Sequence, residues 1–374
     1  MLGIRKYFKG DPVIWLIATL LTLMGLLAVY SATGTLAYAN NRSPQTYLFK
    51  QLFLAALGFG IMWLAHLINF QYYSRVSQIL ILISIPLLLY TLYQTKEVNA
   101  AKRWITLPLI GLSFQTSDFA KLGLIMYVAR FLSKHQEEDS KSKYLYILAS
   151  ISVVCLLIFP ADLSTSALLF LTSIVLLFVG RIPFKYLGGI AIGGALLFFI
   201  GYTILINSDN TGRTGVWKSR VETFLGQEDA DPAKTFQNDQ AKIAIVRGGL
   251  FGVGPGKSVQ RNFLPSPYTD FIYSIIIEEY GLVFGALPIL FLYLLLLWRS
   301  IKIVINTPKS FGAFLAIGLC LLVVLQALVH MGVNVNVFPV TGLTLPMVSL
   351  GGTSLLFTSM AFGIILSVSR YGKE

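Results

Sequence analysis

The stretch VIWLIATLLTLMGLLAVYSA, residues 13–32, is an apolar run without a single charged side chain. Its length matches the ~20 residues that an α-helix needs to cross the hydrocarbon core of a bilayer. It is too long for a cleaved signal peptide and has no clear cleavage site, so we interpret it as a retained helix. The start of the chain therefore predicts an integral membrane protein.

Similar runs recur along the whole chain of 374 residues. Hydrophobic residues make up 55% of it and charged residues only 12%, about half the share found in soluble domains. The mean hydropathy is +0.72. We predict an all-α polytopic membrane protein that forms one domain over residues 1–374. Ten spans are expected, at 13–32, 51–69, 76–94, 114–133, 144–160, 163–180, 186–206, 271–298, 311–332 and 351–369.

The distribution of Lys and Arg predicts how the spans are oriented. Most basic residues of the short loops, such as Arg75, Lys134 and Arg299, lie on the side that carries both termini. Because positive residues are enriched in cytoplasmic loops, both termini are expected in the cytoplasm. The net charge of +12 fits this bias. The chain has no recognisable nucleic-acid-binding motif, so no nucleic-acid partner is expected.

The connection between the seventh and eighth spans, residues 207–270, is much longer than an ordinary loop and is expected on the outer face. Loops of this length are usually functional or disordered. Because aromatic residues are scattered among its charges, we expect a partly ordered cap. Within it, residues 236–247, FQNDQAKIAIVR, are predicted to form a short amphipathic helix.

Two further segments are predicted to be irregular. Residues 333–354 contain Pro and Gly but no charge. Non-helical backbone at membrane depth is tolerated only where protein buries it or where it lines a cavity, so we expect this segment to re-enter and shape a cavity. Residues 99–122 precede the fourth span, and Arg103 and Trp104 within them suit the membrane interface.

Several motif-like stretches do not support the function that they suggest. GGLFGVGPGKS, residues 248–258, has Phe251 where a phosphate-binding P-loop has its first glycine, so its glycines are expected to make tight turns instead. The acidic DAD at 229–231 lacks the soluble α/β domain of nucleotide-sugar glycosyltransferases. The three histidines show no metal-ligand spacing, so no metal site is predicted. The two cysteines lie inside apolar runs and suggest no disulfide.

Lys121 and Asp162 lie at the outer ends of the fourth and sixth spans. Ionisable groups within a membrane usually pair with each other or line a polar path. Two interpretations stay open: a structural ion pair, or the floor of a polar cavity that contacts substrate. Asp118 lies three residues before Lys121 on the same helical face and is a competing partner.

Asp270 ends the outer loop and begins the eighth span. A carboxylate there either caps the helix or acts as a base, because partial desolvation raises the pKa of a carboxyl group and lets it accept a proton. Glu278 follows about 12 Å further along the helix. It can flank the same cavity but cannot share a proton with Asp270. Glu279 has no assigned role.

Six ordered motifs cover nearly the full length of the chain. They are AKRWI (101–105), FQTSDFAKL (114–122), PADLSTSALL (160–169), QNDQAKIAIVRGGLFGVGPG (237–256), LPSPYTDFIYSIIIEEYG (264–281) and FPVTGLTLPMVSLGGTS (338–354). Together they resemble the SEDS family (shape, elongation, division and sporulation), membrane proteins of the RodA and FtsW type. GKSVQ at 256–260 favours the FtsW, division type.

The resemblance implies a peptidoglycan glycosyltransferase that polymerises lipid II at the outer face of the bacterial cytoplasmic (inner) membrane. It also implies a class B penicillin-binding protein, a transpeptidase, as partner, with other divisome or elongasome membrane proteins. Asp270 is similar to the family's catalytic acid, and Lys121 with Asp162 to its buried charged pair. Thr116 and Asp118 depart from the family pattern, in which Pro and Glu are usual.

The expected reaction is an inverting glycosyl transfer with Asp270 as general base. The predicted substrate-binding residues are Lys121, Asp162, Arg103, Trp104, Gln115, Gln240, Lys242, Arg247, Glu278 and Ser349. The leaving pyrophosphate needs cationic stabilisation, from these side chains or from a divalent cation, Mg²⁺ or Mn²⁺. Two alternatives stay open: a lipid II flippase or lipid-linked oligosaccharide transporter, and a non-catalytic scaffold.

Overall fold

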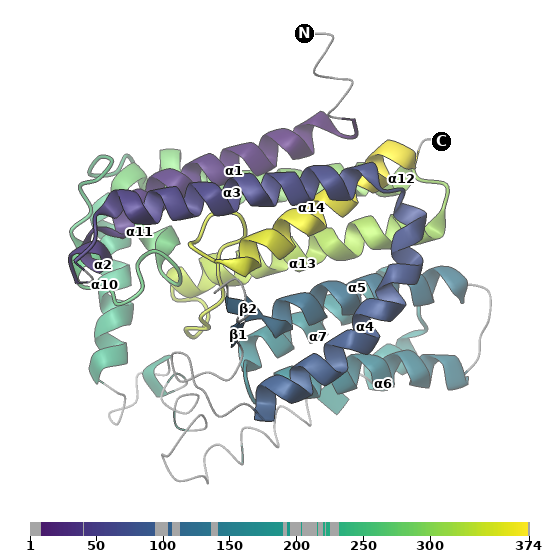
Figure 1. Cartoon of the computed structure of the whole chain (residues 1–374). Coiled ribbons are helices and arrows are strands. Elements are labelled where there is room, and N and C mark those ends of the chain that lie inside the picture. The colour runs from purple at the N-terminus through teal and green to yellow at the C-terminus, as the bar shows by residue number, and fades with distance from the viewer. Residues whose placement is uncertain are drawn as a thin grey trace.

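The computed structural model describes residues 9–39, 41–93, 104–106, 113–135, 141–189, 193–194, 203, 215, 220, 222–224 and 232–372. Long helices lie side by side in one bundle, which confirms the predicted all-α polytopic membrane protein (Figure 1). The helices are α1 (Pro12–Ala32), α2 (Gly34–Ala39), α3 (Pro44–Leu67), α4 (Phe70–Tyr93), α5 (Thr116–Lys134), α6 (Lys141–Ile158), α7 (Leu163–Val179), α10 (Pro232–Gly248), α11 (Ile272–Gly281), α12 (Leu287–Ile305), α13 (Ser310–Asn334) and α14 (Thr353–Tyr371).

The long apolar helices follow the predicted spans, except the seventh, 186–206, which falls mostly outside the described residues. Within the described ranges, 6 helical runs are long and apolar enough to cross a bilayer, and α6 and α7 are shorter apolar helices. The predicted amphipathic segment 236–247 lies within α10. Two short strands, β1 (Trp104–Thr106) and β2 (Ser113–Gln115), pair antiparallel in the segment before α5.

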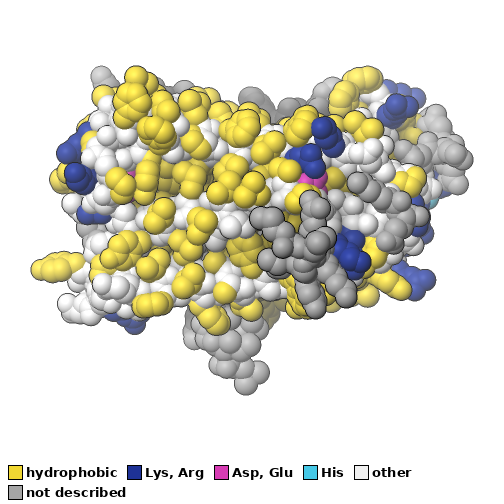
Figure 2. Space-filling view, turned by 90° about the horizontal axis from the view of Figure 1, so that it is seen from above, with side chains coloured by type: hydrophobic (Ala, Val, Ile, Leu, Met, Phe, Trp, Pro, Cys, Tyr) yellow, Lys and Arg dark blue, Asp and Glu magenta, His cyan; other side chains and the backbone are white. Residues whose placement is uncertain are grey.

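The two ends of the bundle differ in what they carry. The helix α1 begins and α14 ends at one end, whereas α10 and the start of α11 lie at the other (Figure 1). Hydrophobic side chains cover the middle of the face shown in Figure 2, and Lys and Arg side chains lie at its left edge and over its right-hand part. This distribution is typical of a belt in contact with lipid between two polar rims.

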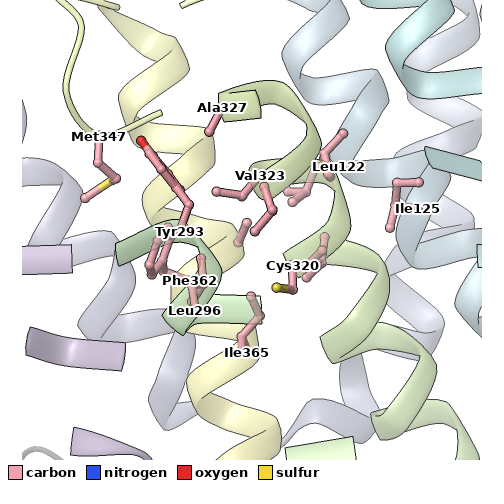
Figure 3. Close-up of a cluster of buried hydrophobic side chains, with 14 of the residues drawn as sticks. Leu122, Ile125, Tyr293, Leu296, Cys320, Val323, Ala327, Met347, Phe362 and Ile365 are labelled. Atoms are coloured by element: carbon pink, nitrogen blue, oxygen red, sulfur yellow. The ribbon is translucent and has the colours of Figure 1, made fainter. Parts of the chain in front are cut away.

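The helix α13 forms the centre of the bundle and packs against α5, α7, α12 and α14. Figure 3 shows the buried cluster where these helices meet, with Tyr293 of α12 between Leu296 and Met347. The hydroxyl of Tyr293 donates a hydrogen bond to the carbonyl of Pro346, at 2.5 Å. Tyr293 thus ties the irregular segment 335–352 to the core. This segment lies within the region predicted to re-enter the membrane.

The eighth span is one continuous apolar run in sequence, but its helix is broken. The helix α11 ends at Gly281, a π-helical turn covers Leu282–Ala286, and α12 continues to Ile305. Gly281 has a φ of +74°, which takes the chain out of the helical region. The span predicted at 271–298 is present as one apolar run, Ile272–Ile305, with this break inside it.

A stretch of the outer loop, residues 249–254, completes the hydrogen bonding that this break interrupts. The carbonyls of Glu278 and Glu279, at the end of α11, accept hydrogen bonds from the amides of Val253 and Gly254 at 2.9 and 3.0 Å. These two carbonyls would otherwise lie unpaired in a largely apolar surrounding, where each would cost free energy.

The same stretch also accepts the amides that follow the break. The N–H groups of Leu282 and Val283 donate to the carbonyls of Gly249 and Leu250, each at 3.0 Å. The outer loop and the broken helix thus form one hydrogen-bonded unit. The glycines of this stretch make turns, as the sequence predicts, because Gly252, Gly254 and Gly256 all have positive φ.

We predict that Gly252→Ala lowers the Tm of the detergent-purified protein more than Gly256→Ala does. Both positions have similar φ values, +81° and +74°, so both substitutions carry the left-handed cost of about 1–2 kcal/mol. A Cβ at Gly252 would also overlap the carbonyl oxygen of Glu279, whereas one at Gly256 would meet open space. Equal changes in Tm would contradict the close approach.

Candidate active site

Asp270 lies half-buried in a turn that ends where α11 begins. The N-cap position of α11 is occupied by Phe271, which makes no capping hydrogen bond with its side chain. Asp270 therefore lies one residue before the N-cap position. The amides of Asp270 and Phe271 both bond to the carbonyl of Ser266, at 3.2 and 3.4 Å, which closes the turn.

Three successive carbonyls of this turn, at residues 268–270, are held by groups from the C-terminal part of the chain. The first accepts from the backbone N–H of Leu350 at 3.0 Å, and the second from the hydroxyl of Ser349 at 2.9 Å. The third accepts from the side-chain amide of Asn334 at 3.0 Å. The backbone under Asp270 is thus fixed by the segment 335–352 and by the end of α13.

Asn334 is the residue that joins this turn to α11, and it was not predicted. Its Oδ1 accepts hydrogen bonds from the backbone N–H and the hydroxyl of Ser274, at 3.0 and 2.9 Å. Its Nδ2 donates to the carbonyls of Asp270 and His330. Asn334 therefore caps the first turn of α11 from another helix. The only signal in the sequence is an amide side chain at the end of an apolar run.

A cavity of about 160 Å³ opens beside Asp270. Arg220 lines it from one side, and Gln237 and Asn238 of α10 from another. Arg220 donates to the carbonyl of Thr341 at 3.2 Å. A Cβ on Gly342 would stand 3.9 Å from the Nη2 of Arg220 and 3.9 Å from the Oδ2 of Asp270, so both side chains approach this glycine. The cavity thus brings a carboxylate, a guanidinium and two amides together.

The phenol of Tyr268 adds to the electrostatics of this turn. Burial raises the pKa of Tyr268 above its usual value, and the charges of Tyr47 and Asp270 raise it further. The phenol therefore stays protonated at neutral pH. It does not add negative charge next to Asp270.

A second polar cluster surrounds Lys121 of α5, which is almost fully buried. Its Nζ lies 2.8 Å from Asp118 and donates to Oε1 of Gln326 at 3.2 Å. Asp118, the competing partner, is therefore the carboxylate that Lys121 contacts. Asp162 caps α7 by accepting the amide of Thr165 at 3.1 Å.

This cluster is linked to the segment that supports Asp270. Gln326 donates to the carbonyl of Thr344 at 2.9 Å, within 335–352. The backbone N–H of Gln115 lies 3.4 Å from the hydroxyl of Thr353, at the start of α14. A polar path therefore runs from α5 through α13 to the irregular segment.

Glu278 is fully buried and faces the outer loop. Its carboxylate accepts the hydroxyl of Ser258 at 2.5 Å and the backbone N–H of Val259 at 3.0 Å. Arg247 approaches it to 3.6 Å. These contacts use both carboxylate oxygens, so Glu278 holds the loop in place beside α11. Its predicted role in substrate binding stays a prediction.

Glu279, which the sequence left without a role, joins the same loop to α1. Its carboxylate accepts the hydroxyl of Ser31 and lies 3.4 Å from the backbone N–H of Ser258. Arg261 lies 4.0 Å from it and donates to the carbonyl of Ser31 at 3.0 Å. The two adjacent glutamates thus anchor residues 258–261 in the bundle.

The remaining predicted residues lie in different surroundings. Lys242 forms an exposed pair with Asp239 at 3.3 Å. Gln240, on α10, is half-buried and is not among the described residues that line the cavity. The backbone of Trp104 pairs with that of Gln115 in the β1–β2 ladder. Arg103 and the acidic stretch 229–231 lie outside the described residues.

A protein-held divalent cation does not fit the residues that the structure describes. No group of three or more His, Cys, Asp or Glu side chains there is close enough to hold a metal ion.

The chain belongs to the FtsW/RodA/SpoVE family of cell cycle proteins, whose family model matches residues 11–374. It is 33% identical to stage V sporulation protein E of Bacillus subtilis, over 98% of this chain and 99% of that protein. It is 34% identical to a probable peptidoglycan glycosyltransferase FtsW of Geobacter sulfurreducens, over 98% and 97% of the two chains. The resemblance to the SEDS family is thereby confirmed.

Solved structures share the same fold. One belongs to work described as structural coordination of polymerization and crosslinking by a peptidoglycan synthase complex. Its chain matches with a TM-score of 0.77 and 25% identity, over 97% of this chain and 98% of that one. A mutant of the rod shape determining protein RodA of Thermus thermophilus matches with a TM-score of 0.71 and 25% identity, over 98% and 99%.

We predict that Asn334→Leu destabilises the protein although the two side chains have the same number of heavy atoms and the same branching. The substitution leaves the Ser274 N–H and the Asp270 carbonyl unpaired and buried, at about 1–3 kcal/mol for each group. Thermal unfolding in detergent measures this loss, and hydrogen exchange at the start of α11 should become faster. Asn262→Leu, at an exposed position, is the control. A Tm unchanged from wild type would contradict the capping role.

Proposed function

We propose that this protein is a peptidoglycan glycosyltransferase that polymerises lipid II at the outer face of the bacterial cytoplasmic membrane. The observation that carries the proposal is the placement of Asp270, which lines a cavity with Arg220 while its backbone is fixed from α13 and the segment 335–352. Relatives that cover nearly the whole chain are named probable peptidoglycan glycosyltransferases, which supports this reaction class.

In the proposed reaction Asp270 acts as general base. Its carboxylate takes the proton of the acceptor sugar hydroxyl while that oxygen attacks the anomeric carbon of the donor. The bond from this carbon to undecaprenyl pyrophosphate breaks, and the configuration inverts. A pyrophosphate is a good leaving group, so one base is enough. The fixed turn supports the reaction because it orients the carboxylate before substrate binds.

Among the described residues, Arg220 is the cation that we assign to stabilise the developing pyrophosphate charge. It lines the same cavity as Asp270, with the amides of Gln237 and Asn238 as further donors. Fixed donors aimed at developing charge are often the largest contribution to catalysis. Lys121 and Arg247 are engaged with Asp118 and Glu278.

The orientation and the partner are part of the same proposal. We place both termini in the cytoplasm, because α1 begins and α14 ends at the end of the bundle opposite α10 and the Asp270 turn. We assign a class B penicillin-binding protein as partner, because a structural relative belongs to a complex that couples polymerisation to crosslinking. Other divisome or elongasome membrane proteins are expected to join them.

We predict that Asp270→Asn lowers the rate of lipid II polymerisation by about 100-fold or more, because a carboxamide cannot accept the proton. The assay uses purified protein with its transpeptidase partner and lipid II. Asp239→Asn changes an exposed acid of α10 and serves as control. Equal rates for Asp270→Asn and wild type would overturn the base assignment.

The same preparation distinguishes the transporter alternative. If wild-type protein scrambles lipid II between leaflets of a vesicle and forms no polymer, the protein is a flippase.

We predict that Arg220→Gln lowers the polymerisation rate by about 10- to 1000-fold, because it removes a cation aimed at the leaving group. Lys257→Gln changes an exposed cation of the outer loop and should leave the rate unchanged. A wild-type rate for Arg220→Gln would mean that other cations stabilise the pyrophosphate charge.

A further inference from the structure

A second and larger cavity, of about 450 Å³, lies at the opposite end of the bundle from Asp270. It is formed where α1 begins and where α12 and α14 end. Among the described residues, four cationic side chains and one carboxylate line it: Lys9, Arg299, Lys302, Arg370 and Asp11. The lining therefore carries an excess of positive charge that the reaction at the outer face does not use.

The single carboxylate is already committed to other groups. Its Oδ1 accepts the backbone N–H of Val13 at 2.9 Å and so caps α1. Its Oδ2 accepts the Nε of Arg299 at 2.8 Å. Asp11 therefore pairs with Arg299 and fixes it at the wall of the cavity.

The other cations have no carboxylate partner among the described residues. The Nζ of Lys302 lies 3.7 Å from the ring centre of Trp298, and the guanidinium of Arg370 lies 4.8 Å from that of Tyr371. The Nη1 of Arg370 is buried and has no hydrogen-bond partner in the described part of the chain. A buried donor without a partner costs free energy, and an anion in the cavity would remove that cost.

Close approaches at two glycines build the cavity. A Cβ on Gly10 would stand 3.0 Å from the carbonyl oxygen of Leu366, which shows how closely the chain before α1 approaches α14. A Cβ on Gly372 would stand 2.7 Å from the hydroxyl of Thr307, after α12. The three helix ends are thus held together around the basic side chains.

The height of this cavity in the bilayer identifies the kind of anion. The 21 residues of α1 span about 31 Å, close to the ~30 Å hydrocarbon core, so Asp11 lies at the level of lipid phosphates. Trp298, 48% exposed, suits an interface position. On the same helix Ile301 and Ile305 are 43% and 76% exposed, which provides apolar surface for acyl chains next to the basic cavity.

We propose that this cavity binds the phosphate group of an anionic phospholipid from the adjacent leaflet. Basic pockets between membrane helices recognise such head groups by charge. Lys302 and Arg370 would contact the phosphate, while the acyl chains would lie along α12. A bound lipid would join the ends of α1, α12 and α14 and so stabilise the bundle.

The test titrates lipid into the purified full-length chain in a neutral detergent and follows Tm, while native mass spectrometry counts the bound lipids. The probes are phosphatidylglycerol, phosphatidylcholine and inorganic phosphate. Phosphatidylglycerol should bind and raise the Tm of wild type. The double variant K302Q/R370Q should bind it about thirtyfold more weakly, at roughly 1 kcal/mol for each cation removed.

Two controls separate the site from general surface charge. R75Q/K185Q removes one Arg and one Lys from exposed positions outside the cavity and should bind lipid like wild type. K302R/R370K keeps both charges and should restore binding. If K302Q/R370Q is misfolded, the single variant K302Q, which changes an exposed side chain and leaves the Asp11–Arg299 pair intact, carries the test.

Three results would overturn the proposal. The first is equal binding of phosphatidylglycerol by K302Q/R370Q and wild type. The second is equal stabilisation by phosphatidylcholine, which has a phosphate but no net charge. The third is stabilisation by inorganic phosphate alone to the same extent, which would assign the cavity to a soluble anion.

Discussion

Every backbone N–H and C=O at membrane depth must find a partner within the protein, and this requirement shapes the half of the molecule that carries Asp270. The chain leaves helical geometry at Gly281 and again over 335–352. In each place another segment provides the missing partners. Residues 249–254 bond to both sides of the break at Gly281, and the segment 335–352 bonds to the turn of Asp270.

The site therefore depends on segments that are far apart in sequence. Asn334 and Ser349 hold the carbonyls beneath Asp270, while Glu278 and Glu279 hold the outer loop on the far side of α11. Adjacent glutamates inside a membrane helix would be costly on their own. Here each accepts hydrogen bonds from the loop backbone, so their burial is offset and the loop is ordered by it.

The two ends of the bundle differ in how their charged side chains are paired. At the end that holds Asp270, buried carboxylates are paired with backbone amides and arginines, and the cavity beside it combines both signs of charge. At the other end the cations outnumber the carboxylates among the described residues, and one buried guanidinium N–H has no hydrogen-bond partner within them. The first arrangement suits a reaction that moves a proton and releases an anion, and the second suits binding of an anion from outside the chain.

The sequence by itself determined the membrane class, the spans that fall within the described residues, the helix within the outer loop, the irregular segment before α14 and the position of Asp270 at a helix start. These follow from apolar run length and from Gly and Pro, which are local properties of the chain. Only the tertiary structure decided that Lys121 donates to Gln326 of α13, that Asn334 caps α11, that Arg220 lies in the cavity of Asp270 and that the eighth span breaks. A buried polar group takes its partner from whichever segment packs against it, and that packing is set by the whole bundle.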